Sequence, residues 1–445
     1  MVVISQASKL TLPNPSLPSS PPQITSALYE PNSLSLALMH SDSSISVYTS
    51  VSLLSLSSLP STPQILVPSP SFSFTFFLLN DNFNPNPRVA FIVAGPHRTE
   101  AKIVLRLYVL QRNNIYGKAQ VVCKQKGICF DEKLGVLLDI NHGVGLKLAG
   151  SVNFFAMYSF TSSKIWVFSV KLMDGDYGLR VKLMRCAVID CCKPVWSLSL
   201  SFGFMILGEE NGVRILNLRS LVKGKVKKVK NLILPNGIIG DDGFDGPSGK
   251  IACNGHLDEK ANKHSVSEKQ RSVKYRLDSS EGGACFLAFK VKEDEGLKST
   301  KLPLMSLKAI SIQAVSQKQF LILDSGGDLH ILHLSNPVAG SNITGHIRQL
   351  PHVMNVQKLA VHPDISPRTQ TIWITDGYHT VHMMVASDMD VADGENGRNE
   401  SEENLTQYSV IEAIFVDEKI QDLVPLAANG LLILGQGNLY AYANS

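Results

Sequence analysis

Residues 321–334, LILDSGGDLHILHL, contain the pattern that decides the fold. A short apolar run ends at a turn made of Asp, Ser and Gly residues, and a second apolar run follows the turn. Turn residues of this kind permit the tight reversal that joins two antiparallel strands, and short apolar runs bounded by them are typical of strands. The stretch therefore predicts a β-hairpin.

The same pattern recurs along the chain. Clear copies begin at residues 204, 372 and 431 (FMILGEENGVRILNL, IWITDGYHTVHMMV and LLILGQGNLYAY), and fainter copies begin at residues 36, 89 and 152. The seven starts are separated by 53, 63, 52, 117, 51 and 59 residues, so one interval is about twice the others. That interval contains the polar, Gly- and Lys-rich residues 223–281, and removing these 59 residues leaves a spacing of 58.

Further strand candidates lie between the hairpins, so each repeat of about 55 residues holds about four strands, which is typical of a propeller blade. We expect an all-β chain that forms a single closed β-propeller of seven blades. Residues 1–222 are expected to form blades one to four, residues 223–281 a disordered basic insertion, and residues 282–445 blades five to seven. An eight-bladed ring and a two-sheet architecture in two domains are the alternatives.

The last repeat ends just after its third strand. We expect residues 2–5 (VVIS) and 9–12 (KLTL) to supply the missing outer strand and to close the ring. Closure would remove the exposed sheet edge that otherwise invites aggregation.

Residues 359–387, LAVHPDISPRTQTIWITDGYHTVHMMVAS, resemble a WD-repeat blade. An apolar strand leads into His362-Pro363-Asp364, a second strand follows, and an Asp376-Gly377 turn leads to the third. The Trp-Asp dipeptide that defines the family is absent from the sequence. The resemblance is therefore to a divergent WD-repeat-like superfamily, and it implies a propeller fold.

No motif predicts catalysis. Residues 240–250, GDDGFDGPSGK, depart from a phosphate-binding loop because Phe244 replaces its first Gly and Ile251 replaces its Ser or Thr. Neither a G-x-S-x-G elbow nor an H-E-x-x-H pair occurs. We expect no catalytic residues and no cofactor. The alternative is a propeller-type hydrolase or lyase whose site forms at the channel mouth, where distant histidines would converge, namely His40, His97, His142, His362 and His379.

Metal binding and disulfides are also not predicted. The seven cysteines include no C-x-x-C pair, which favours reduced thiols. The acidic residues 388–403 lack the Gly and Glu that a helix-loop-helix calcium site requires at its sixth and twelfth positions.

Positive charge is concentrated in the insertion. Residues 223–276 contain twelve basic and six acidic residues, a net charge of +6 against +4 for the whole chain. Five lysines fall within residues 223–230, KGKVKKVK: Lys223, Lys225, Lys227, Lys228 and Lys230. A basic segment of this kind fits the acidic groove of an import receptor or contacts nucleic-acid phosphates.

The sequence therefore predicts a non-catalytic scaffold for protein–protein interactions within a multi-subunit complex, with partners whose identity it does not reveal. We expect it in the nucleus, the cytoplasm or both. A nucleic-acid-associated propeller subunit that uses the basic insertion is an alternative. The most apolar run, FSFTFFLL at residues 72–79, is far shorter than the roughly 20 residues of a membrane helix, and no secretory leader is recognised. The Ser- and Pro-rich residues 1–75 leave an organellar address as the alternative location.

Overall fold

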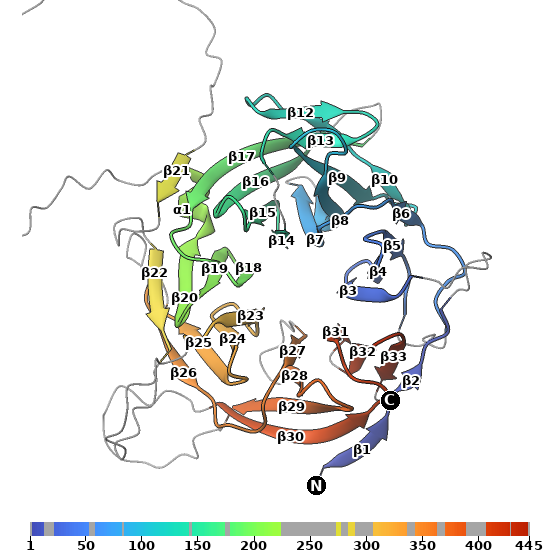
Figure 1. Ribbon diagram of the computed structural model, residues 1–445, viewed down its shortest axis with the longest axis vertical. Coiled ribbons are helices and arrows are strands. Elements are labelled where there is room, and N and C mark those ends of the chain that lie inside the picture. The colour runs from blue at the N-terminus through green and yellow to red at the C-terminus, as the bar shows by residue number, and fades with distance from the viewer. Residues whose placement is uncertain are drawn as a thin grey trace, which may run out of the picture.

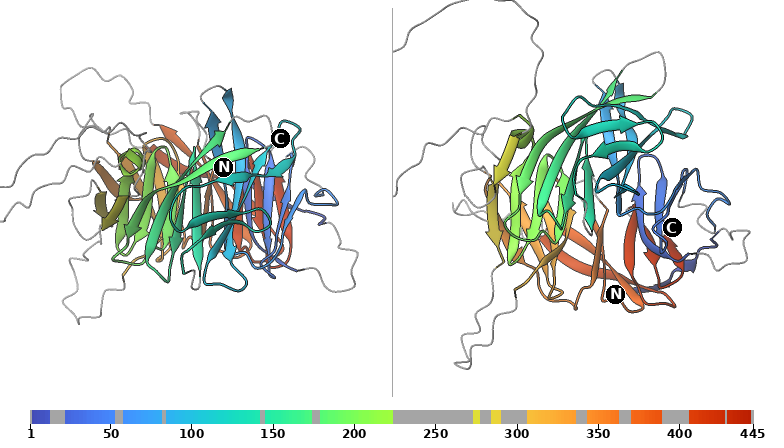
Figure 2. Two further views of the ribbon diagram at one scale, coloured as in Figure 1. Left: turned by 90° about the horizontal axis from the view of Figure 1, so that it is seen from above. Right: turned by 45° about the horizontal axis from the view of Figure 1, so that its top comes forward.

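The computed structural model describes residues 2–12, 22–52, 58–81, 84–141, 145–173, 179–223, 273–276, 284–289, 306–335, 343–362, 370–388, 406–427 and 429–443. The strands form seven sheets that stand around a common centre (Figure 1). Seen from the side, strands of neighbouring sheets stand next to one another along the ring (Figure 2). This seven-bladed ring confirms the propeller architecture that the WD-repeat resemblance implies.

Each blade is built around four strands, in the order inner to outer. Blade one contains β3 (Ile24–Glu30), β4 (Ser35–His40), β5 (Ile45–Tyr48) and β6 (Ile65–Val67). Blade two contains β7 (Ser73–Asp81), β8 (Asn84–Pro96) and β9 (Ile103–Leu110), with the outer strands β13 (Gly135–Leu138), β12 (Ile128–Asp131) and β10 (Tyr116–Lys118). Blade three contains β14 (Leu146–Ser151), β15 (Phe154–Ser159), β16 (Lys164–Met173) and β17 (Arg180–Asp190), with β11 (Gln120–Val122) paired to β17.

Blades four to seven follow in chain order. Blade four contains β18 (Ser197–Ser201), β19 (Phe204–Glu209), β20 (Gly212–Asn217) and β22 (Ala284–Ala288), and blade five contains β23 (Ala309–Ala314), β24 (Gln319–Asp324), β25 (Leu329–Leu334) and β26 (Gly345–Gln349). Blade six contains β27 (Lys358–Val361), β28 (Gln370–Thr375), β29 (Thr380–Asp388) and β30 (Thr406–Phe415). Blade seven contains β31 (Asp422–Ala427), β32 (Gly430–Leu434) and β33 (Leu439–Ala443).

The seven predicted hairpins are the second and third strands of the seven blades. In blade five, for example, β24 and β25 are antiparallel, with Leu321 opposite Ile331. These strands are buried on both faces, because apolar side chains from adjacent blades meet in every seam. Between blades two and three, Phe155 stacks on Phe168 at a centroid distance of 4.9 Å and Phe77 packs beside them. Such burial explains the continuous apolar runs in the sequence.

The N-terminal segment closes the ring, but differently from the expectation. Strand β2 (Ser8–Lys9) is the outer strand of blade seven, and the Leu10 amide donates to the Leu439 carbonyl at 2.8 Å. Residues 2–5 do not join that blade. Instead β1 (Val3–Gln6) runs parallel to β30 in blade six, and its Ser5 hydroxyl donates to Glu412. The buried Ala7 carries the chain across the seam, so one segment fastens two blades.

The basic insertion lies within blade four. It begins at Lys223, the last residue of α1 (Leu218–Lys223), and β22, which pairs with β20, follows it. Blade four is therefore completed within residues 282–445, which the sequence pattern assigns to blades five to seven. Four residues of the expected disordered segment form β21 (Val273–Arg276), which is parallel to β17 of blade three. The rest of that prediction falls on residues 224–272 and 277–281, outside the described residues. In the described part of the chain, no helix is long and apolar enough to span a membrane.

Candidate functional site at the channel mouth

The inner strands run in the same direction, so their C-terminal ends meet at one end of the central channel. A cavity of about 700 Å³ opens there. It is bordered by the C-terminal ends of β3, β14, β18 and β23, by the middle of β7, by Val361 of β27, and by α1. Its apolar lining comes from Leu28, Phe76, Phe77, Leu78, Val152, Phe154, Leu200, Phe202, Leu218, Val222, Ile312, Ala314 and Val361.

Two tight turns present apolar side chains at this mouth. The β14–β15 turn contains Val152, which is 41% exposed, and the β18–β19 turn contains Phe202, which is 43% exposed. Phe202 has a φ of 51°, in the left-handed region that non-glycine residues rarely adopt. Strain of this kind costs on the order of 1–3 kcal/mol and persists where the surroundings or a function require it. Leu34 and Asn153 have φ of 51° and 62° in the corresponding turns of blades one and three, so the left-handed backbone belongs to this type of turn. At residue 202 the turn leaves an apolar side chain exposed beside the cavity.

Glu30, the acidic residue in the lining, is hydrogen-bonded to residues of its own turn. Glu30 is buried, and its carboxylate accepts hydrogen bonds from the amide and side chain of Asn32 at 3.2 and 2.7 Å and from the amide and hydroxyl of Ser33 at 2.7 and 2.6 Å. The neighbouring Tyr29 donates to the Val51 carbonyl at 3.1 Å, and burial, followed by the charge of Glu30, raises the pKa of Tyr29 to about 12. Glu30 therefore stabilises the β3–β4 turn, and Tyr29 connects β3 to the segment that follows β5.

The histidines considered from the sequence do not converge on the channel. His40 is hydrogen-bonded to the Ser46 hydroxyl at 2.8 Å, and burial lowers its pKa. His97 caps its own turn by accepting from the Glu100 amide at 3.1 Å. His362 follows β27 and His379 bonds to the Val416 carbonyl, whereas His142 lies outside the described residues. None of the described four lines the cavity.

Of the five candidate lysines, the structure describes only the first, Lys223. Lys223 is the last residue of α1, and Lys225, Lys227, Lys228 and Lys230 lie outside the described residues. No group of three or more His, Cys, Asp or Glu side chains is arranged to hold a metal ion in the part of the chain that the structure describes.

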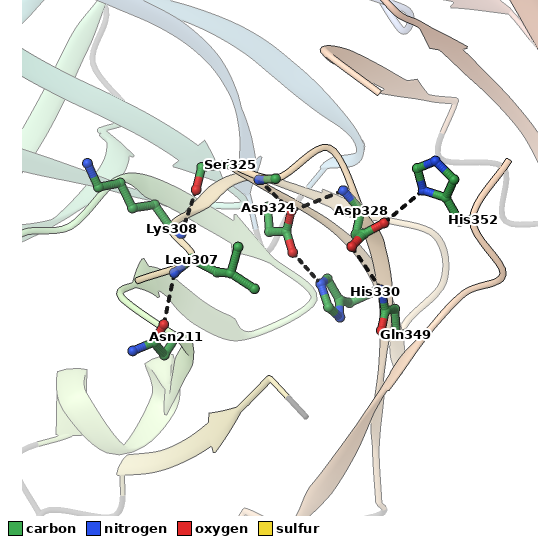
Figure 3. A network of polar contacts seen from close by, with 10 residues as sticks. Asn211, Leu307, Lys308, Asp324, Ser325, Asp328, His330, Gln349 and His352 are labelled. Atoms are coloured by element: carbon green, nitrogen blue, oxygen red, sulfur yellow. Dashed lines mark hydrogen bonds and ion pairs between the residues drawn. The ribbon is translucent and has the colours of Figure 1, made fainter. Parts of the chain in front are cut away.

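A buried polar network in blade five was not foreseen. The Asp324 carboxylate accepts from the amides of Gly326 and Asp328 at 2.8 and 3.0 Å and pairs with His330 at 2.8 Å (Figure 3). Burial alone would raise the pKa of Asp324, but the hydrogen bonds from His330 and then from the turn amides hold it below its usual value. Phe289 stacks on His330 at 4.2 Å. The network fastens the β24–β25 turn and does not line the cavity.

Comparisons with known proteins identify no matching family model and no matching curated protein. Three solved structures are similar to this chain. The Cps50 (Swd1) β-propeller domain of Myceliophteria thermophila has 9% sequence identity, a TM-score of 0.48 and a match that covers 97% of this chain and 99% of that chain. U3-55K has 7% identity and a TM-score of 0.43, with 96% of this chain and 97% of that chain covered, and Sqt1 of Saccharomyces cerevisiae has 10% identity and a TM-score of 0.41, with 99% and 100% covered.

Proposed function

We propose that this chain is a non-catalytic propeller platform that binds a segment of a protein partner at the channel mouth. The apolar cavity of about 700 Å³, with Val152 and Phe202 exposed beside it, carries the proposal. Binding energy at protein interfaces is concentrated where a few apolar side chains enter a water-excluding pocket. The ring is rigid and holds this pocket on one face, so it can position a bound partner without catalysing a reaction.

The alternative of a channel-mouth hydrolase or lyase is disfavoured by the lining. An enzyme of that class needs two or more convergent carboxylates or histidines that can exchange protons. Among the described lining residues, Glu30 is the one carboxylate, and its hydrogen bonds hold the β3–β4 turn. The apolar pocket therefore favours recognition over catalysis.

Polar substitutions at the mouth should separate binding from folding. Phe202→Asn together with Val152→Asn is expected to weaken partner binding at least about 10-fold, which corresponds to roughly 1.4 kcal/mol, because two interfacial apolar side chains are lost. Asn tolerates the left-handed backbone at residue 202, so the melting temperature should stay nearly unchanged. The measurement is quantitative affinity capture from cells, with mass spectrometry of the stoichiometric partners.

Tyr378→Asn is the matched control, because Tyr378 is 59% exposed in the β28–β29 turn of blade six and does not line the cavity. Partners should be retained by this control and lost by the double variant. Equal recovery with both variants would show that the mouth is not the interface.

We further propose that Lys223, Lys225, Lys227, Lys228 and Lys230 bind an import receptor and place the protein partly in the nucleus. Support comes from the charge of the segment, since five lysines occur within eight residues. Replacement of all five by Gln is expected to shift the protein towards the cytoplasm, whereas replacement by Arg, which keeps the charge, should preserve the distribution. Quantitative imaging of the tagged chain checks this. An unchanged distribution in the Gln variant would mean that the lysines are ordinary solvated charges.

A further inference from the structure

The end of the channel opposite the cavity carries two lysines and a tryptophan in blades three to five. The inner strands β14, β18 and β23 are neighbours in the ring, and their N-terminal ends lie at this end of the channel (Figure 1). Lys147 is the second residue of β14, Trp196 directly precedes β18, and Lys308 directly precedes β23. All three residues are partly exposed, so a ligand can reach them from solvent.

Trp196 joins the two lysines into one site. The Lys147 ammonium group donates a hydrogen bond to the Trp196 carbonyl from blade three. The Lys308 ammonium group lies over the Trp196 ring from blade five, 4.1 Å from the ring centroid. Both positive charges therefore contact the same residue, although they come from blades on either side of it. We name Lys147, Trp196 and Lys308 the lysine–tryptophan site.

The two lysines of this site have no acidic partner among the described residues. The carboxylates that form ion pairs in that part of the chain pair with other cations. Glu209, at the end of β19, is held by Arg214 through contacts of 2.6 and 3.0 Å. Glu210 meets Lys308 through a backbone bridge, without an ion pair between the side chains. Burial lowers the pKa of Lys147, as expected for an ammonium group without a nearby carboxylate.

Blade six provides the contrast at the same end of the channel. Lys358 is the first residue of β27, and Asp422 is the first residue of the next inner strand, β31. Burial raises the pKa of Asp422, and the charge of Lys358 opposes this rise, so the two side chains interact. The ring therefore supplies a carboxylate beside Lys358 but none for Lys147 and Lys308 within the described chain.

We infer that the lysine–tryptophan site binds carboxylate groups of a partner protein. An ammonium group carries three donors, and the Trp196 carbonyl accepts only one from Lys147, so donors remain for a carboxylate. The site contains no arginine, whose planar fork favours phosphate. Phe160 is 37% exposed and its ring lies 5.4 Å from the Lys147 ammonium group, which adds an apolar surface for a neighbouring side chain of the partner. The site lies at the opposite end of the channel from the cavity and does not depend on binding there.

The test uses the immobilised full chain to select binders from two libraries of random peptides. In the first library the peptide is joined to its carrier at both ends, and in the second it ends in a free carboxylate. We expect selected peptides of the first library to be enriched in Asp and Glu if acidic side chains are the ligands. Binding that requires the free end of the second library would assign the C-terminal carboxylate instead.

Substitution of the lysines then places the selected peptides on the ring. Lys147→Gln with Lys308→Gln should weaken binding of a labelled selected peptide at least about 10-fold in fluorescence anisotropy, because two charge-assisted contacts are lost. Lys308→Gln alone should weaken it by a smaller factor. This single variant keeps the hydrogen bond from Lys147 to Trp196, so the test stays valid if the double variant fails to fold.

Two controls decide the assignment. Lys358→Gln makes the same change of charge at the same end of the channel and should bind the peptide as the unchanged chain does. Phe202→Asn with Val152→Asn, which alters the cavity at the other end, should also leave this binding unchanged. If selected peptides have no excess of acidic residues and need no free C-terminus, or if they bind the double lysine variant as tightly as the unchanged chain, the inference is wrong. Equal weakening by Lys358→Gln and Lys308→Gln would also contradict it.

Discussion

Deletion of residues 2–12 is expected to lower the melting temperature by about 5–10 °C, which corresponds to a loss of roughly 5 kcal/mol in the free energy of unfolding. The deletion removes Leu10, which is 2% exposed and packs in the seam between blades seven and one. It also removes the hydrogen bonds from Ala7 to Phe415 and from Leu10 to Leu439. Differential scanning calorimetry measures the change.

A shorter deletion separates the two roles of this segment. Removal of residues 2–5 takes away most of β1 but leaves β2, Ala7 and Leu10 in place, so we expect less than half of the effect. The longer deletion also exposes β33 as an edge strand, and we expect it to promote aggregation. Equal melting temperatures for the full chain and the longer deletion would contradict closure by β2.

Replacement of Asp324 by Ala is expected to cost about 2–4 kcal/mol, because a buried side chain that is left without its hydrogen-bond partner costs about 1–3 kcal/mol and two turn amides lose their acceptor as well. His330, which is 2% exposed, would lose its partner, and the turn amides of Gly326 and Asp328 would lose their acceptor. Asp42→Ala is the control. Asp42 accepts from Ser44 in the β4–β5 turn but is exposed, so its loss should cost about 1 kcal/mol or less.

The pH dependence of stability tests the same network. Because the pKa of Asp324 is lower in the folded chain, its contribution is present above the unfolded value of about 3.9 and is lost as pH falls through the folded pKa. The difference in stability between the unchanged chain and Asp324→Asn should therefore shrink below about pH 4. A cost for Asp324→Ala equal to that for Asp42→Ala, or a difference independent of pH, would show that the network contributes little.

The ring was predictable from the sequence because its evidence is local. Each hairpin carries its turn residues and its two apolar runs within 12 to 22 residues, and the spacing between hairpins gives the number of blades. Pairings between distant segments carry no such signal. The parallel addition of β1 to β30, of β21 to β17 and of β11 to β17 depends on which edges the finished ring leaves open. The expectation for residues 2–5 was wrong for this reason.

The candidate sites were less predictable. Phe202 and Val152 look like ordinary strand-end residues in the sequence, and only the meeting of inner strands around the channel brings them to one mouth. The partner of Asp324 was similarly hidden, because His330 reads as part of an apolar strand.

The most direct test of the platform is hydrogen–deuterium exchange of the full chain with and without its most abundant stoichiometric partner. The account predicts that the partner slows exchange in the segments that border the channel mouth, residues 28–34, 150–154 and 199–204, and leaves the outer strands of blades five and six unchanged. Protection confined to the outer strands, with unchanged exchange at the mouth, would contradict it.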